Sequence, residues 1–277
     1  MAVVGTWCFA AVVVDARSAE AAEWEQVWAD EFDVDGRPNP KNWTYETGLI
    51  RNEELQWYQP ENAVCKNGML IITARRERVA NTHPNPDEPG WAKRRLHADY
   101  TSACLITKGL HHWRYGRIEM RARLDTREGL WPAFWTMGVS GDWPHCGEID
   151  IMEYFRGTLL ANAFWGSKKK WVPVSSIHRF PLERLGDASW PSQFHVWRMD
   201  WDEKWIEIFL DDKSLCRIDL DKTKNEDQAS INPMREPHYL LLNLAIGGNS
   251  GGDPAKTEFP ATLEVDYVRV YQRKMGR

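Results

Sequence analysis

The chain has 277 residues, a length at which a single all-β domain is common. Hydrophobic residues make up 43% of it, enough for a sizeable core, and a formal net charge of −5 disfavours a nucleic acid partner. The 16 tryptophans outnumber both phenylalanine and tyrosine. Because a buried indole N–H needs a hydrogen-bond partner, we expect about half of these rings to pack in the core and the others to line a surface or cleft.

The first 22 residues (1–22) have the pattern of a secretory signal peptide. An apolar run over residues 2–14 is followed by Asp15, Arg17 and small residues up to Ala22, although no Lys or Arg precedes the run. The run is too short to span a bilayer, and no other segment comes near the length needed. We therefore expect a secreted or periplasmic protein, cleaved near Ala21 or Ala22, with no membrane partner.

Four cysteines remain after such a cleavage, namely Cys65, Cys104, Cys146 and Cys216. Their wide spacing matches neither a zinc site nor a dense disulfide framework. In an exported protein they could form up to two disulfides. The alternative is four buried free thiols.

The rest of the chain is a succession of short segments rich in β-branched and aromatic residues, separated by clusters of Gly, Pro, Asn and Asp. We expect strands within residues 69–74, 100–107, 117–123, 133–137, 149–155, 196–200, 205–210, 238–245 and 263–271. This spacing predicts a sandwich or barrel of antiparallel strands. Long loops are expected at 80–95, 181–193 and 221–236, and none resembles an interdomain linker, so residues 23–277 are expected to form one domain.

An acidic motif follows Gly147, where Glu148, Asp150 and Glu153 are separated by apolar residues. Alternation along a strand places Glu148 and Asp150 on one face and Glu153 on the other. A single β-bulge at Ile151 or Met152 would return Glu153 to the first face, because one extra residue shifts everything after it. We therefore predict a bulged strand that presents three acids to one side.

Three carboxyl groups close together cannot all ionise at neutral pH, so one of them keeps its proton. Glycoside hydrolysis needs that divided state, with one ionised nucleophile and one protonated acid. Two glutamates that lean inward could bring their carboxyls to about 5 Å, the separation of retaining enzymes rather than inverting ones. The alternative is a solvated acidic face on an edge strand, against which the many nearby aromatic residues argue.

An ordered set of motifs resembles glycoside hydrolase family 16, in particular its laminarinase-like branch of endo-β-1,3(4)-glucanases. The matching segments are VWADEF at 27–32, NEELQWY at 52–58, YGRIE at 115–119, GLWPAFW at 129–135, WP at 143–144, FHVW at 194–197, NLAIGG at 243–248 and VDYVRVY at 265–271. One such motif would be a weak signal, but the set covers almost all of residues 23–277.

The resemblance implies an all-β fold, a β-jelly-roll sandwich of two curved antiparallel sheets whose concave face is an open substrate cleft. It implies Glu148 as nucleophile, Glu153 as general acid/base, and Asp150 as the residue that tunes and orients them. The bulged spacing is that of the laminarinase-like form, whereas the mixed-linkage lichenases of bacilli use a shorter, unbulged one. The implied activity is endo-hydrolysis of β-1,3-glucan or mixed-linkage β-1,3-1,4-glucan by double displacement, in a monomer without a catalytic cofactor.

The resemblance also implies a set of substrate contacts. Those expected are Asn52, Glu53, Gln56, Trp131, Trp135, Trp143, Trp165, His195 and Asn243. Flat indole faces suit the C–H face of a sugar, with core packing as the alternative for the tryptophans. For the polar residues of the 52–56 loop the alternative is a plain loop role, and for His195 it is a buried strand cap.

Family members often hold one structural Ca²⁺ on the convex side. In this chain it would use the Asp266 side chain and backbone oxygens near Glu31 and Gly68, since Ca²⁺ takes oxygen ligands. The alternative is an ion pair of Glu31 or Asp266 with an arginine.

Three other functions stay open. A non-catalytic β-glucan-binding protein on this fold would lack the paired glutamates. A transglycosylase would use the same acids and differ in how well its cleft excludes water. A hydrolase of agar- or carrageenan-type galactans would need an arginine-lined cleft for sulfated substrates, against which the acidic balance argues weakly.

Overall fold

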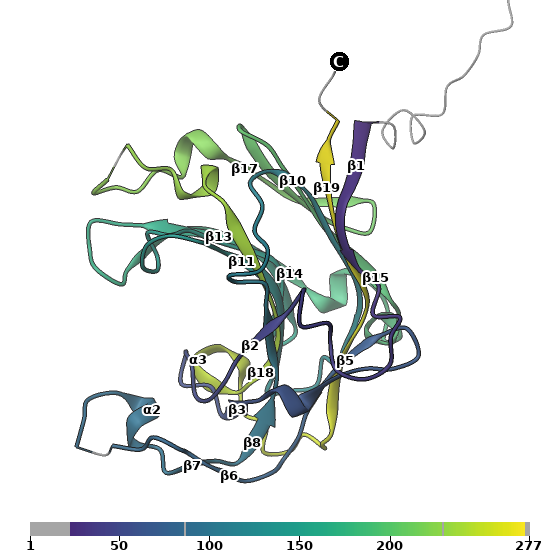
Figure 1. Cartoon of the computed structure of the whole chain (residues 1–277), viewed down its shortest axis with the longest axis vertical. Coiled ribbons are helices and arrows are strands. Elements are labelled where there is room, and N and C mark those ends of the chain that lie inside the picture. The colour runs from purple at the N-terminus through teal and green to yellow at the C-terminus, as the bar shows by residue number, and fades with distance from the viewer. Residues whose placement is uncertain (1–22, 86, 229, 275–277) are drawn as a thin grey trace, which may run out of the picture.

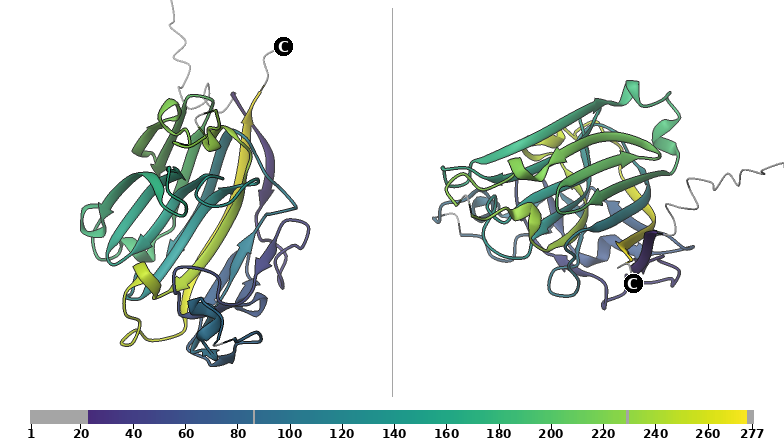
Figure 2. Two further views of the ribbon diagram at one scale, coloured as in Figure 1. Left: turned by 90° about the vertical axis from the view of Figure 1, so that its left-hand side faces the viewer. Right: turned by 90° about the horizontal axis from the view of Figure 1, so that it is seen from above.

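The computed structural model describes residues 23–85, 87–228 and 230–274, so the expected signal peptide (1–22) lies outside the described residues. Two large, curved antiparallel sheets stack on each other over most of this length (Figure 1). The first and last strands pair with each other, so the two ends of the described chain lie together (Figures 1 and 2). This arrangement confirms the predicted antiparallel sandwich.

The outer sheet has eight strands within the described residues. Their order is β17 (Lys213–Asp219), β16 (Trp205–Leu210), β15 (His195–Trp201), β10 (Gly116–Leu124), β19 (Ala261–Arg273), β5 (Leu70–Ala74) and β4 (Ala63–Cys65), with β1 (Trp24–Asp30) also paired to β19. The 13-residue length of β19 explains this branching, because β1 and β5 pair with different parts of it.

The second sheet, called here the cleft sheet, has seven strands within the described residues. Their order is β14 (Pro173–Pro181), β13 (Thr158–Gly166), β12 (Glu148–Phe155), β11 (Leu130–Gly138), β18 (His238–Ile246), β9 (Cys104–Ile106) and β2 (Thr44–Glu46). The predicted strand 100–107 is therefore divided, because residues 100–102 form β8 (Tyr100–Ser102), which pairs with β3 (Gln56–Tyr58) instead.

The expected long loops contain short elements. These are β6 (Val79–Ala80), α2 (Trp91–Arg94) and β7 (His97–Ala98) in and beside the first, η2 (Leu182–Arg184) and η3 (Trp190–Ser192) in the second, and η4 (Leu220–Lys222) and η5 (Pro233–Arg235) in and beside the third. Two further short helices are η1 (Pro60–Asn62) and α3 (Gly248–Gly251). No helix within the described ranges is long and apolar enough to cross a membrane.

The core lies between the two sheets and is built by alternation along the strands. On β10, for example, Ile118, Met120 and Ala122 are buried against residues from the cleft sheet. Burial of each such Ile or Met stabilises the fold by about 1.5–3 kcal/mol. The four cysteines are buried and free, which is the second of the two alternatives for them.

Candidate active site

The three acids lie on one face of β12, and a β-bulge puts them there. Asp150 is opposite Asn162 and Glu153 is opposite Leu160, so three steps on β12 match two on β13. A matching irregularity occurs against β11. Ile151 and Met152 consequently both point into the core, and the predicted bulge at these residues is confirmed.

Hydrogen bonds link the three carboxyl groups. The Asn162 amide donates to Asp150 at 2.9 Å and to Glu153 at 3.1 Å, and Glu148 is hydrogen-bonded to Asp150. Indole N–H groups donate to the two outer acids: Trp131 to Glu153 at 2.7 Å and Trp143 to Glu148 at 2.5 Å. Each glutamate is therefore fixed by a rigid donor as well as by its neighbours.

Burial raises the pKa of all three carboxyls. It raises the pKa of Glu153 to about 8, with a smaller contribution from the charge of Asp150 and opposition from the Trp131 and Asn162 donors. It raises the pKa of Asp150 to about 6 and that of Glu148 well above its ordinary value, the latter also through repulsion by the other two acids. At neutral pH Glu153 therefore holds a proton, and Glu148 shares one with Asp150 across their hydrogen bond.

The acids open into a cleft of about 640 Å³, which is lined by alternate residues of β11, β12, β13, β14 and β18. Trp131, Trp135 and Trp143 line this cleft, as the resemblance implied. Asn52 and Asn243 line it too. These five predicted contacts are therefore brought together around the acids.

A polar network supports one side of the cleft. Asn243 accepts a hydrogen bond from Trp135 at 2.8 Å and donates to Tyr58 at 3.1 Å. The Arg51 guanidinium lies over the Trp135 ring, 5.1 Å from its centroid, and pairs with Glu46. The indole of Trp135 is thus held from its edge and its face, which leaves its orientation little freedom.

Glu54 is a cleft residue that the sequence analysis did not single out. It is buried, lines the cleft, and receives hydrogen bonds from Gln56 at 2.7 Å and Asn52 at 3.3 Å. The nearby Gly248 has φ +66°, and a Cβ there would lie 2.6 Å from the Asn52 carbonyl oxygen. The Gly247-Gly248 pair of the NLAIGG motif therefore lets the Asn52–Glu54 loop approach β18, a signal that points to this loop.

The structure places two predicted contacts of the 52–56 loop outside the lining of the cleft. Glu53 is exposed and does not line the cleft, because a positive φ at Asn52 and at Glu53 turns the loop there. Gln56 is fully buried behind the cleft, where it donates to Glu54 and accepts from the Ile246 amide at 2.7 Å. Gln56 therefore orients Glu54 rather than lining the cleft.

Two further predicted contacts lie elsewhere. Trp165 packs in the core, because its neighbour Phe164 pairs with Glu148 and takes the cleft side of β13. His195 is on the outer sheet, stacked on Trp190 at 4.1 Å and bonded to Asp211 at 2.9 Å. His195 is therefore the buried strand residue of the alternative interpretation.

Arginines pair with the side chains of Asp266 and Glu31, two of the residues expected at the calcium site. Asp266 pairs with Arg121 at 2.6 Å, and Glu31 forms two hydrogen bonds with Arg269 at 2.7 Å. Across the described part of the chain, no group of three or more His, Cys, Asp or Glu side chains is placed to hold a metal. These contacts of Asp266 and Glu31 are the ion pairs of the alternative interpretation.

A jelly-roll sandwich whose concave sheet presents paired, indole-bound glutamates beside an aromatic cleft defines a glycoside hydrolase. Residues 53–269 match the model of "Glycosyl hydrolases family 16". The chain belongs to this family, as the motifs predicted.

Individual proteins agree with the family assignment. A "Beta-glucanase" of Rhodothermus marinus is 37% identical over 92% of this chain and 88% of its own length. The laminarinase catalytic domain of Thermotoga maritima is 32% identical, with a TM-score of 0.76 over 92% of this chain and 100% of its own. A chain from work on endo-acting O-glycanases of the human gut microbiota, which initiate mucin breakdown, is also 32% identical, with a TM-score of 0.82 over 91% of this chain and 92% of its own.

Proposed function

We propose that this protein is a retaining endo-hydrolase of β-glucan in which Glu148 is the nucleophile and Glu153 the general acid/base. The bulge that places both glutamates on the cleft face, each with its own indole donor, carries the proposal. The similar β-glucanase and laminarinase support β-1,3-glucan or mixed-linkage β-1,3-1,4-glucan as the substrate.

In the first half of the reaction, Glu148 attacks the anomeric carbon while Glu153 donates its proton to the departing glycosidic oxygen. Glu148 must be ionised to attack, so its proton moves across the hydrogen bond to Asp150. The Trp143 N–H stabilises the carboxylate that this transfer leaves on Glu148. The C–O bond breaks, and a covalent glycosyl-enzyme forms.

In the second half, Glu153 is a carboxylate and acts as a base. It takes a proton from a water molecule whose oxygen attacks the anomeric carbon, and the bond to Glu148 breaks. The donors on Glu153, from Trp131 and Asn162, stabilise its charge in this half of the cycle only. Two inversions at one carbon retain the configuration.

We propose that the sugar chain crosses the strands of the cleft sheet. Glu153, Leu160 and Arg179 form a row across β12, β13 and β14, and all three line the cleft. Two strand spacings separate Arg179 from Glu153, about 10 Å in all. Arg179 on the edge strand has no ion pair or hydrogen bond with another described residue, so its guanidinium is available to sugar oxygens.

A product profile tests the substrate. The purified protein is incubated with laminarin, lichenan, barley β-glucan, agarose, carrageenan and mucin O-glycans, and the oligosaccharides released are sized and sequenced. We expect internal cleavage of laminarin or of a mixed-linkage glucan. If no glucan is cut, the proposed function is wrong. Cleavage of mucin O-glycans alone would favour a second candidate function, that of an O-glycanase. The TM-score of 0.82 with the chain from work on endo-acting O-glycanases supports this candidate.

Azide rescue tests the two catalytic roles. In Glu148→Ala, azide takes the place of the nucleophile and an activated β-glucoside should yield the α-glycosyl azide. In Glu153→Ala, azide replaces water in the second step and should yield the β-glycosyl azide. Glu61→Ala, at an exposed glutamate of η1, is the matched control and should behave as the wild type. Full activity of either active-site variant would exclude the assignment. The products that the wild type forms from laminarin would also distinguish hydrolysis from transglycosylation, and the absence of any product would indicate binding alone.

We further propose that residues 23–277 act as one secreted or periplasmic, monomeric catalytic domain that needs no calcium to fold. The apolar run at 2–14 supports export, and the Arg121 and Arg269 ion pairs support the calcium independence. N-terminal sequencing of exported protein should begin near Glu23, and size-exclusion chromatography should give the monomer mass. A retained residue 1 or a dimer would contradict these proposals.

A further inference from the structure

The segment between β17 and β18 contacts the turn that carries Trp143, although some 80 residues separate the two in sequence. Asn225 donates to the His145 carbonyl at 3.1 Å and accepts from the Gly166 amide at 2.7 Å. The Asp227 carboxylate accepts from the His145 ring at 2.9 Å. Two side chains of this segment therefore fasten the turn to the end of β13.

The same turn fixes the donor to the nucleophile. Backbone hydrogen bonds from Cys146 to Asp142 and from Gly147 to Pro144 close it into one unit directly before β12. Trp143 within it donates to Glu148 at 2.5 Å. Because the turn is closed on both sides, a displacement of His145 moves the Trp143 indole with it.

The space around His145 leaves the turn little freedom. A Cβ on Gly166 would lie 2.4 Å from the His145 ring, so the ring packs directly on the β13 backbone. Glu226 completes this contact, since its amide donates to the Gly166 carbonyl at 2.9 Å. Loss of the hydrogen bond from the His145 ring to Asp227 would therefore let the ring shift against the backbone of β13.

A second contact lies beside Glu148 itself. A Cβ on Gly147 would lie 2.8 Å from Pro233, which begins η5. His238 is buried, a condition that lowers its pKa to about 4, and its neutral ring donates to the Pro233 carbonyl at 3.0 Å. The residue before Glu148 is thus packed against a helix turn that is itself hydrogen-bonded to the cleft sheet.

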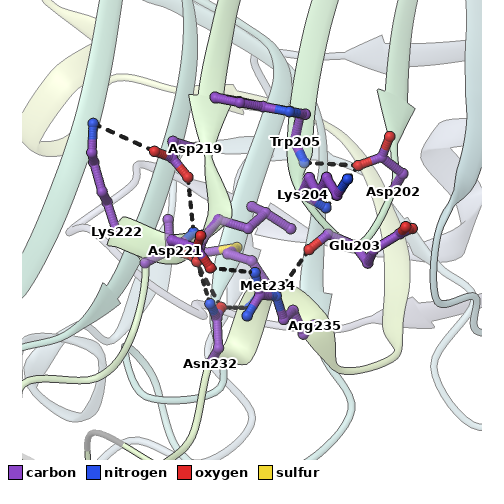
Figure 3. Close-up of polar contacts among 12 residues, drawn as sticks. Asp202, Glu203, Lys204, Trp205, Asp219, Asp221, Lys222, Asn232, Met234 and Arg235 are labelled. Atoms are coloured by element: carbon purple, nitrogen blue, oxygen red, sulfur yellow. Dashed lines mark hydrogen bonds and ion pairs between the residues drawn. The ribbon is translucent and has the colours of Figure 1, made fainter.

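Polar contacts hold the base of the segment in place, as Figure 3 shows. Asn232 caps η5 by accepting from the Met234 amide at 3.1 Å. Arg235 donates to Asp221 at 2.8 Å and to the Glu203 carbonyl at 3.0 Å. The residues that reach the turn consequently project from an anchored base.

We propose that Asn225, Asp227 and Pro233 form a buttress that positions Trp143, and through it the nucleophile Glu148. These are positioning residues that do not touch the substrate: none of them lines the cleft. The inference rests on the proposed function, because the role of Glu148 gives the placement of Trp143 its catalytic meaning. Through these residues, the segment between β17 and β18 controls the rate of the chemical step.

The kinetic test replaces the half-exposed Asp227, whose loss should leave the protein folded. Misplacement of a reacting group by 1 Å can cost about 100-fold in rate, so a partial release in Asp227→Ala should lower kcat by on the order of 10-fold. KM should change little, since no substrate contact is lost. Asp227→Asn keeps an acceptor oxygen for His145 and should restore most of kcat. The control is Lys222→Ala, an exposed residue of η4 in the same connection, which should match the wild type.

A spectroscopic test needs no substrate. The indole N–H resonance of Trp143, assigned through Trp143→Phe, reports its hydrogen bond to Glu148 and should move in Asp227→Ala but not in Asp227→Asn or Lys222→Ala. An unmoved resonance, or a loss that appears in KM alone, would overturn the buttress. If the wild type cuts no glucan, the proposed function fails, whereas this resonance still decides whether Asp227 positions Trp143.

Discussion

Replacing Glu153 by glutamine should stabilise the protein while it abolishes hydrolysis. Burial, and secondarily the charge of Asp150, raises the pKa of Glu153 to about 8 from an ordinary value of 4.5. Between these two pH values the folded protein holds a proton that the unfolded chain has released. The stability from this group is therefore complete below about pH 4.5 and is lost as the pH rises through about 8.

The size of the effect follows from the linkage between protons and folding. Each pH unit in this window costs about 1.4 kcal/mol, so the wild type loses roughly 4 kcal/mol of unfolding free energy from pH 5 to pH 8 through Glu153. Glutamine does not titrate, so the variant lacks this pH dependence, and its side chain is uncharged like the protonated Glu153 of the wild type below about pH 8. Its carbonyl can accept from Trp131, while the lost contact with Asn162 costs about 1 kcal/mol at every pH.

Urea unfolding of the wild type and Glu153→Gln at several pH values between 5 and 8.5 measures this difference. The variant should be equal to or slightly below the wild type at pH 5 and several kcal/mol above it at pH 8. Glu25→Gln, at an exposed position of β1, is the control and should run parallel to the wild type. Parallel curves for Glu153→Gln as well would refute the buried-acid interpretation of this site.

Three further measurements address the site and its surroundings. Trp131→Phe removes a donor that lowers the pKa of Glu153, so the alkaline limb of kcat/KM should move upward by about 1 pH unit, and a downward shift would contradict this. Addition of EDTA should leave the unfolding temperature unchanged, because Arg121 already neutralises Asp266, the one side chain expected to bind Ca²⁺; a drop that Ca²⁺ reverses would show that the protein binds structural calcium. A thiol reagent should modify the four buried cysteines only after denaturation, and fewer than four reactive thiols in urea would reveal a disulfide.

The strand pattern and the acidic motif could be predicted because both depend on local periodicity. Two-residue alternation fixes which side chains share a face, and the five-residue step from Glu148 to Glu153 violates it unless one residue bulges. The bulge at Ile151 and Met152 was therefore predictable from the spacing alone.

The misplaced side chains lie where alternation gives no information. Asn52 and Glu53 adopt positive φ, so the loop presents Glu54 to the cleft rather than Glu53. On β13, the choice between Phe164 and Trp165 depends on the register with β12, in which Phe164 is opposite Glu148. That register is set by contacts across strands, and no pattern within residues 158–166 encodes it.

The bulge is also the part of the site that a deletion can test. Removal of Met152 leaves Glu148, Asp150 and Glu153 at alternate positions of a regular strand, so all three stay on the cleft face. Removal of Ile149 instead makes Glu148 and Asp150 adjacent and turns one of them into the core. Both deletions remove one fully buried side chain, with a packing cost of about 2–5 kcal/mol each, and Ile149 deletion also carries the cost of burying a carboxyl group.

Activity per folded molecule should therefore differ between the two deletions. We expect Met152 deletion to retain measurable hydrolysis, because both of its glutamates still point into the cleft, and Ile149 deletion to have none. Rates on laminarin per folded molecule, with the folded fraction taken from urea unfolding, make the comparison. An equal loss of activity in both deletions would show that the bulge does more than determine the face on which the glutamates lie. The separation that the bulge gives the two carboxyls would then itself be required for the double displacement.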